Sequence, residues 1–104
     1  MYVIIWEFQV KAEHSVEFEK IYGVTGAWAI LFHKQQGYLG TELLRDSQGH
    51  ERYLTIDRWE SLGDYESFLS LWKKEYEALD VLCEGLTEDE TMIGRWETTE
   101  QETP

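Results

Sequence analysis

The chain has 104 residues, and its 21 acidic and nine basic side chains give a formal net charge of −12 at pH 7. A field of that sign repels the phosphates of nucleic acids and of anionic lipids, so we expect neither as a partner. The N-terminus lacks the basic region of a signal peptide, and no apolar run approaches the roughly 20 residues of a membrane span. We therefore expect a cytoplasmic protein with one domain over residues 1–97, followed by a polar, flexible tail at 98–104.

The first strand is predicted at Tyr2–Val10, where residues alternate between apolar and polar from Trp6 onward. The run before Trp6 is apolar on both faces, as in a strand covered on both sides. After a polar turn at 11–15, a helical pattern runs from residue 16 to residue 34, and two glycines, Gly23 and Gly26, interrupt it. Such a break either kinks the helix or opens the mouth of a pocket beside the sheet.

Two more strands are predicted at Tyr38–Arg45 and Arg52–Trp59, joined by a polar hairpin connection at 46–51. Their side chains alternate, so Asp57 and Arg58 point to opposite faces, and we expect Arg58 to pair with Glu7 or Glu42. The third strand runs directly into a helix start, because Ser61 is followed three residues later by an acidic residue in the form of a capping box.

A second helix is predicted from an apolar stripe with a period near 3.6 residues. Its members are Leu62, Tyr65, Phe68, Leu69, Trp72, Tyr76, Leu79, Leu82 and Leu86. We expect an acidic turn at 87–90 and a last strand at 91–97. The lone cysteine, Cys83, lies in the apolar pattern, so we expect it to be buried and free of any internal disulfide.

The order β-α-β-β-α-β predicts an α+β, ferredoxin-like fold, in which two helices cover one face of a four-stranded antiparallel sheet. Depending on register, the other face carries either Leu39, Leu43, Leu54 and Ile56 or Trp6, Phe8, Leu44 and Trp59. Either set is too apolar to be left in water. We therefore predict a homodimer in which two sheets pack face to face.

The sequence contains few recognisable catalytic or metal-binding motifs. None of the three histidines has metal-ligand spacing to another His, Cys or carboxylate pair, so we expect no metal site. Nucleotide-binding glycine patterns and the nucleophile motif of hydrolases are absent. His33 either favours the dipole at a helix C-terminus or belongs to a pocket.

An aromatic cavity is the remaining candidate site, because five Trp, six Tyr and four Phe are many for this length. We expect it to hold a flat, apolar ligand with a few polar groups to orient it. The residues expected around it are Trp6, Trp28, Phe32, His33, Trp59, Tyr65, Phe68 and Trp72.

Four segments together resemble the antibiotic biosynthesis monooxygenase family of dimeric α+β barrel proteins. They are YVIIWEFQV, GYLGTELLRD, RYLTIDRWES and the W-x-x-E-Y of the second helix, and the resemblance spans residues 2–97. It implies a homodimer that oxygenates aromatic polyketide or quinol substrates without metal, flavin or haem. The haem-degrading branch relies on an Asn in the first strand and a His in the second helix, and this chain has neither.

The resemblance implies that Trp59 and Tyr65 pack against the substrate ring. We predict catalytic roles for His33, Tyr65 and Glu42, with His33 or Glu42 as the proton acceptor. Substrate-binding roles are predicted for Trp59, Trp6, Trp28, Phe32, Phe68 and Trp72. The alternative is a dimer of the same fold that binds a small ligand without turnover.

Overall fold

A computed structural model describes residues 1–99; the remainder of the predicted tail, residues 100–104, lies outside the described residues. The strands are β1 (Tyr2–Val10), β2 (Tyr38–Arg45), β3 (Arg52–Trp59) and β4 (Thr87–Glu97). The helices are α1 (Ser15–Tyr22), α2 (Ala27–Phe32), α3 (Leu62–Leu71) and α4 (Lys73–Cys83), with short 3-10 turns at Ala12–His14 and Glu84–Leu86. None of these helices is long and apolar enough to cross a bilayer.

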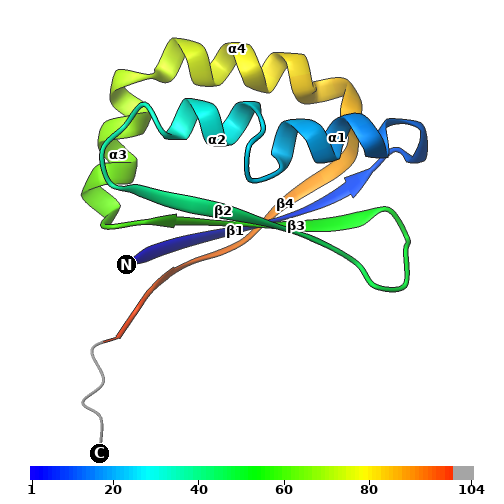
Figure 1. Cartoon of the computed structure of the whole chain (residues 1–104), viewed down its shortest axis with the longest axis horizontal. Coiled ribbons are helices and arrows are strands. Elements are labelled where there is room, and N and C mark those ends of the chain that lie inside the picture. The colour runs from blue at the N-terminus through cyan, green and yellow to red at the C-terminus, as the bar shows by residue number, and fades with distance from the viewer. Residues whose placement is uncertain (100–104) are drawn as a thin grey trace, which may run out of the picture.

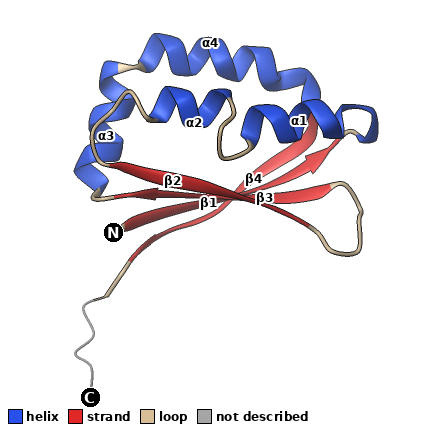
Figure 2. Cartoon of the chain, viewed as in Figure 1, coloured by secondary structure: helices blue, strands red, loops and turns tan. Residues whose placement is uncertain are grey.

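The strands form one antiparallel sheet in the order β2-β3-β1-β4. All four helices lie on the same side of this sheet (Figures 1 and 2). This arrangement confirms the predicted α+β, ferredoxin-like fold. It also places the core between the helix layer and one face of the sheet.

The first helical segment is broken where the glycines predict, because α1 ends at Tyr22 and α2 begins at Ala27. A Cβ on Gly26 would lie 2.3 Å from the carbonyl oxygens of Lys20 and Ile21. Only glycine allows the chain to pass this close to the end of α1. The loop therefore folds back on α1 before α2 begins.

The second helical segment is not one helix, which corrects the prediction. Trp72 leaves helical geometry, with φ −115° and ψ 25°, and separates α3 from α4. The two helices run in different directions, α3 at one end of the sheet and α4 alongside α2 (Figure 1). Because α3 and α4 point in different directions, one continuous apolar stripe cannot face the core along both helices, and Leu82 is 78% exposed. Cys83 is buried, as predicted.

The last strand begins at Thr87, so the acidic turn predicted at 87–90 is wrong. These residues pair with the end of β1, where Asp89 lies opposite Gln9 and Glu90 opposite Phe8. β4 is an edge strand, and charged side chains are common on such strands because much of the strand faces water. Hydrogen bonding to β1 therefore overrides the turn-like composition.

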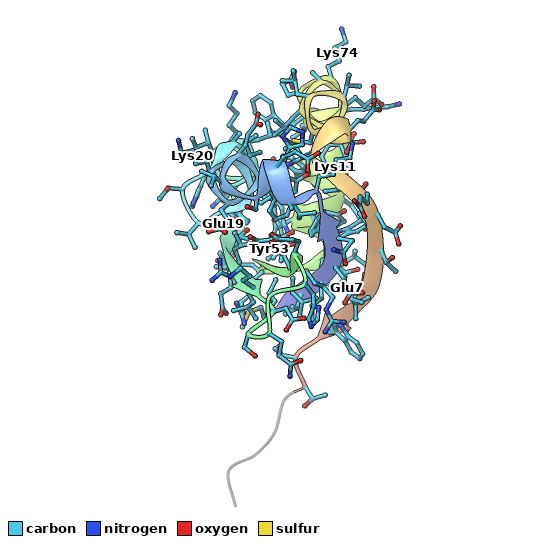
Figure 3. The ribbon with its side chains drawn as sticks, turned by 90° about the vertical axis from the view of Figure 1, so that its right-hand side faces the viewer. Glu7, Lys11, Glu19, Lys20, Tyr53 and Lys74 are labelled. Atoms are coloured by element: carbon cyan, nitrogen blue, oxygen red, sulfur yellow. The ribbon has the colours of Figure 1, made fainter. Side chains whose placement is uncertain are left out.

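Several aromatic side chains fill the core, and Trp59, Tyr53, Phe18 and Phe68 are among the largest fully buried ones. The Tyr53 hydroxyl lies between α1 and the sheet and donates a hydrogen bond to Glu19 Oε2 at 2.6 Å (Figure 3). The predicted helix cap is also present, because the backbone N–H of Asp64 donates to Ser61 Oγ at 3.1 Å.

The uncovered face of the sheet matches neither predicted set. Its apolar residues are Val3, Ile5, Leu44, Leu54, Ile56 and Trp96, whereas Trp6, Phe8, Leu43 and Trp59 lie on the helix-covered face. A bulge between Tyr38 and Gly40 causes the difference, because one extra residue exchanges the two faces of β2. The predicted pair of Arg58 with Glu42 forms on this uncovered face.

Candidate active site

A cavity of about 60 Å³ lies between the sheet and the helix layer. Its walls are mostly aromatic, contributed by β1, α1, α2 and α4: Trp6, Phe8, Tyr22, Trp28, Phe32 and Tyr76. Most of the rings pack edge to face or tilted against one another, for example Trp28 on Tyr76 with centroids 5.1 Å apart, while Trp6 stacks on Phe8. The arrangement suits a flat aromatic ring.

Four polar side chains complete the lining: Thr55, Asp57, Asp80 and Glu90. Thr55 and Asp57 come from the same face of β3, two residues apart, and both are buried. Asp80 on α4 and Glu90 on β4 are exposed, and they also line a neighbouring acidic hollow of about 380 Å³. The cavity therefore combines a buried carboxylate with an acidic entrance.

Asp57 is the chemically distinctive residue of the cavity. Its side chain is only 8% exposed, and Oδ1 accepts a hydrogen bond from the Thr41 hydroxyl at 2.6 Å. The Thr41 hydroxyl is in turn bonded to the hydroxyl of Tyr38. Within residues 1–99, Oδ2 of Asp57 has no hydrogen-bond partner. Burial raises the pKa of Asp57 to about 6, against the opposing effect of the Thr41 hydrogen bond. A carboxylate of this kind can act as a general base near neutral pH.

The two tyrosines of the cavity are poor acids. Burial raises the pKa of Tyr76 to about 12, and burial with the neighbouring Cys83 thiol raises the pKa of Tyr22 further above its usual range. Both hydroxyls stay protonated at neutral pH and can donate hydrogen bonds to a ligand. Nε1 of Trp28 is also buried, with no partner among the described residues.

The model of the family described as antibiotic biosynthesis monooxygenase matches residues 1–72. The chain belongs to the antibiotic biosynthesis monooxygenase family. The match includes β1, β2, β3 and α3, and with them Trp6, Trp28, Phe32, Thr55 and Asp57 of the cavity. Phe8 and Tyr22 also lie within the match, whereas Tyr76, Asp80 and Glu90 lie C-terminal to it.

Solved structures show the same fold. A candidate monooxygenase of this family from Deinococcus radiodurans is 19% identical with a TM-score of 0.75, and the match covers 100% of this chain and 98% of that one. SnoaB, a cofactor-independent oxygenase from Streptomyces nogalater, is 21% identical with a TM-score of 0.72, covering 99% and 96%. A candidate family member from Bordetella bronchiseptica is 18% identical with a TM-score of 0.73, covering 94% and 96%. No curated protein sequence matches the chain.

In this family member, three of the predicted substrate-binding residues line the cavity: Trp6, Trp28 and Phe32. Trp59 and Phe68 are fully buried behind its wall, with ring centroids 5.6 and 5.1 Å from that of Phe32. These two residues support the wall and do not reach the cavity.

The remaining predicted residues lie away from the cavity lining. Tyr65 is buried, stacks on Tyr2 and lies under the Arg95 guanidinium. Trp72 is partly buried beneath the Lys34 ammonium, at 5.2 Å. His33 is exposed at the end of α2, with its ring 4.6 Å from that of Tyr38. Glu42 lies on the uncovered face of the sheet with Arg58.

Sequence reasoning missed Asp57 as a site residue, although the signal was present. Alternation in β3 places Tyr53, Thr55, Asp57 and Trp59 on one face, and a carboxylate among aromatic residues on a buried face is unusual. Asp80 and Glu90 had no such signal, because each belongs to a segment rich in acidic residues. Among residues 1–99, no three His, Cys, Asp or Glu side chains gather as a metal site would require.

Proposed function

We propose that this protein is a cofactor-independent monooxygenase that acts on an aromatic hydroxyl compound, either a quinol or a polyketide-like ring. The observation that carries the proposal is Asp57, a buried carboxylate with one free oxygen in an aromatic cavity. Membership of the family and the shared fold with SnoaB, a cofactor-independent oxygenase, support it.

In the proposed mechanism, the substrate ring lies among Trp6, Trp28 and Phe32, and Oδ2 of Asp57 accepts the proton of its hydroxyl group. The resulting anion is electron-rich and reduces oxygen directly. For a quinol, one oxygen atom enters the ring and the other leaves as water, giving a hydroxyquinone. The substrate supplies all the electrons, so no external reductant is needed.

The residues behind the wall have supporting roles in this proposal. Trp59 packs on Phe32 and lies two residues after Asp57 in β3, so it fixes both the wall and the base. The rings of Phe68 and Tyr65 both contact Trp59, each with its centroid 5.5 Å from that of Trp59. Asp57 replaces His33 and Glu42 as the proposed proton acceptor, because neither of those residues lines the cavity.

The test is oxygen consumption with a panel of quinols and hydroxylated polycyclic aromatics, after metal chelation and with flavin and haem excluded by absorbance. We expect uptake that saturates with substrate, and we expect Asp57→Asn to lower the rate about 100-fold or more, as loss of a general base does. Glu42→Gln is the matched control, since Glu42 is a carboxylate on the opposite face of the sheet.

The same panel of compounds distinguishes the monooxygenase from the alternative, a dimer that binds a small ligand without turnover. If no compound supports uptake but one raises the melting temperature and is recovered unchanged, the protein is a ligand-binding dimer without turnover. If Asp57→Asn consumes oxygen at the wild-type rate, Asp57 is not the proton acceptor. His33 and Tyr65 would then be the next candidate catalytic residues.

We also propose that the protein is a homodimer, formed through the uncovered face of the sheet. Val3, Ile5, Leu54 and Ile56 lie at the centre of that face, with Ile5 directly opposite Ile56, and all four are half-buried in the single chain. Trp96 at the edge is 54% exposed. Apolar surface of this kind is costly in water and is covered when two sheets pack face to face.

A further inference from the structure

The charge around the cavity has one sign. Three of its lining residues are carboxylic acids, Asp57, Asp80 and Glu90, and none of the described lining residues is Lys, Arg or His. The neighbouring hollow shares Tyr22, Asp80 and Glu90 with the cavity and adds only further acidic residues to the charge. Desolvation and the nearby Asp80 and Asp89 raise the pKa of Glu90, so these carboxylates repel one another.

Polar groups inside the cavity lack partners in the protein. Asp57 is more than nine-tenths buried, and its Oδ2 is free among the described residues. Trp28 is similarly buried, and its indole N–H makes no hydrogen bond of good geometry within residues 1–99, although the Tyr22 hydroxyl and the Cys83 thiol lie near it. Buried polar groups are normally hydrogen-bonded, so unpaired ones in a cavity point to a ligand that pairs with them. A ligand in the cavity should therefore offer a hydrogen-bond donor to Asp57, as a hydroxyl group does.

We propose that the natural ligand is a single-ring hydroxylated aromatic that carries a protonated amine, with its hydroxyl at Asp57 and its ammonium group at Asp80 and Glu90. This inference rests on the proposed function for the hydroxyl group and extends it to the charge and size of the substrate. A cavity of about 60 Å³ is too small to enclose a polycyclic compound, and even a single ring would extend from it into the larger hollow that Asp80 and Glu90 share.

Electrostatics distinguishes this ligand from the neutral and anionic alternatives. An ammonium group is attracted both by the carboxylates and by the faces of nearby aromatic rings such as Tyr76. A carboxylate on the ligand would be repelled by the same groups. The amine also offsets the negative charge that appears when Asp57 removes the hydroxyl proton, because the deprotonated substrate is then a zwitterion instead of an anion.

The test compares the binding of three probes of nearly equal shape by isothermal titration calorimetry: tyramine, 4-ethylphenol and 3-(4-hydroxyphenyl)propionate. These monophenols share a ring with a two-carbon side chain in the para position, and they differ in its terminal group, which is an ammonium, a hydrogen and a carboxylate respectively. We expect tyramine to bind at least about tenfold more tightly than 4-ethylphenol, and the propionate to bind most weakly. Equal or tighter binding of 4-ethylphenol or the propionate would overturn the inference, as would no binding of tyramine up to about 1 mM.

A double variant, Asp80→Asn with Glu90→Gln, tests the position of the ammonium group. We expect it to lose about tenfold in tyramine affinity while 4-ethylphenol affinity changes by less than about twofold. Glu66→Gln is the control, because Glu66 is exposed on α3 and lines neither hollow. Unchanged tyramine binding in the double variant would overturn the inference. The wild-type comparison stands even if the double variant fails to fold.

The two proposals fail separately. Tyramine binding is measured without turnover, so it does not depend on oxygen chemistry. Tight tyramine binding without oxygen uptake by any quinol would retain the ligand class and reject the monooxygenase. Uptake with neutral quinols but no preference for tyramine would retain the monooxygenase and reject the amine.

Discussion

The hydroxyl of Thr41 on β2 donates a hydrogen bond to the carboxylate of Asp57, the residue opposite it on β3, at 2.6 Å. This bond opposes the effect of burial on the pKa of Asp57. Because the bulge after Tyr38 sets the phase of β2, it also decides that Thr41 faces the carboxylate. The chemistry of the cavity therefore depends on the register of two neighbouring strands.

Replacing Thr41 with Val is expected to raise the pKa of Asp57 further, since the carboxylate loses a hydrogen bond that favours its charged form. The side-chain carboxyl shift of Asp57, followed by NMR as a function of pH, measures the change. In an active enzyme, the acidic limb of the pH–rate profile should move by the same amount. Thr41→Ser keeps the hydroxyl and should leave both curves in place; a matching shift in the serine variant would contradict this origin.

Asp57 should also make stability depend on pH. Its folded pKa, about 6, lies above its ordinary value of 3.8, so the native state holds the proton more tightly than the unfolded chain does. The stability linked to this proton is fully present below pH 4 and is lost as pH rises through 6. The loss amounts to about 3 kcal/mol, because each tenfold difference in proton affinity between the two states corresponds to 1.36 kcal/mol.

Asp57→Asn removes this titration while keeping an acceptor for Thr41. We expect the variant to gain stability relative to the wild type between pH 4 and pH 7, measured by urea denaturation at each pH. A difference between the two proteins that stays constant over this range would show that Asp57 does not titrate there.

The proposed dimer predicts a sharp contrast between two apolar-to-acidic substitutions. Ile56→Glu places a charge at the centre of the uncovered sheet face and should give a monomer in size-exclusion chromatography with light scattering. Leu71→Glu is the control, because Leu71 is 69% exposed on α3, in the helix layer. Dimers of equal stability in both variants, or a monomeric wild type, would rule out this interface.

The break between α1 and α2 predicts opposite effects for two glycine substitutions. Gly26→Ala should cost about 2 kcal/mol or more, because its Cβ would overlap two backbone oxygens that cannot easily move. Gly63→Ala should be neutral or stabilising by up to about 1 kcal/mol, since Gly63 lies in α3 and its Cβ would have 3.7 Å of clearance from Ser61 Oγ. Thermal unfolding of both variants measures the difference, and a stable Gly26→Ala protein would contradict the close approach.

Local sequence signals were sufficient for much of this fold. The bounds of β2 and β3, the cap at Ser61 and the break after Tyr22 all follow from alternation, hydroxyl capping and glycine spacing. Each of these features depends on residues within a few positions of one another. The order of elements then restricts the topology, because short connections and antiparallel pairing leave few ways to arrange β-α-β-β-α-β.

Tertiary structure decided what depends on residues far apart in the chain. The helix break at Trp72 and the early start of β4 reflect packing and pairing that override local composition. The bulge in β2 exchanged the faces that alternation had assigned. Most importantly, Asp57, Asp80 and Glu90 meet at one cavity only because β3, α4 and β4 pack together. By itself, the sequence determined the elements and the family resemblance, but long-range packing determined the chemistry of the cavity, since no local pattern records which distant carboxylates meet.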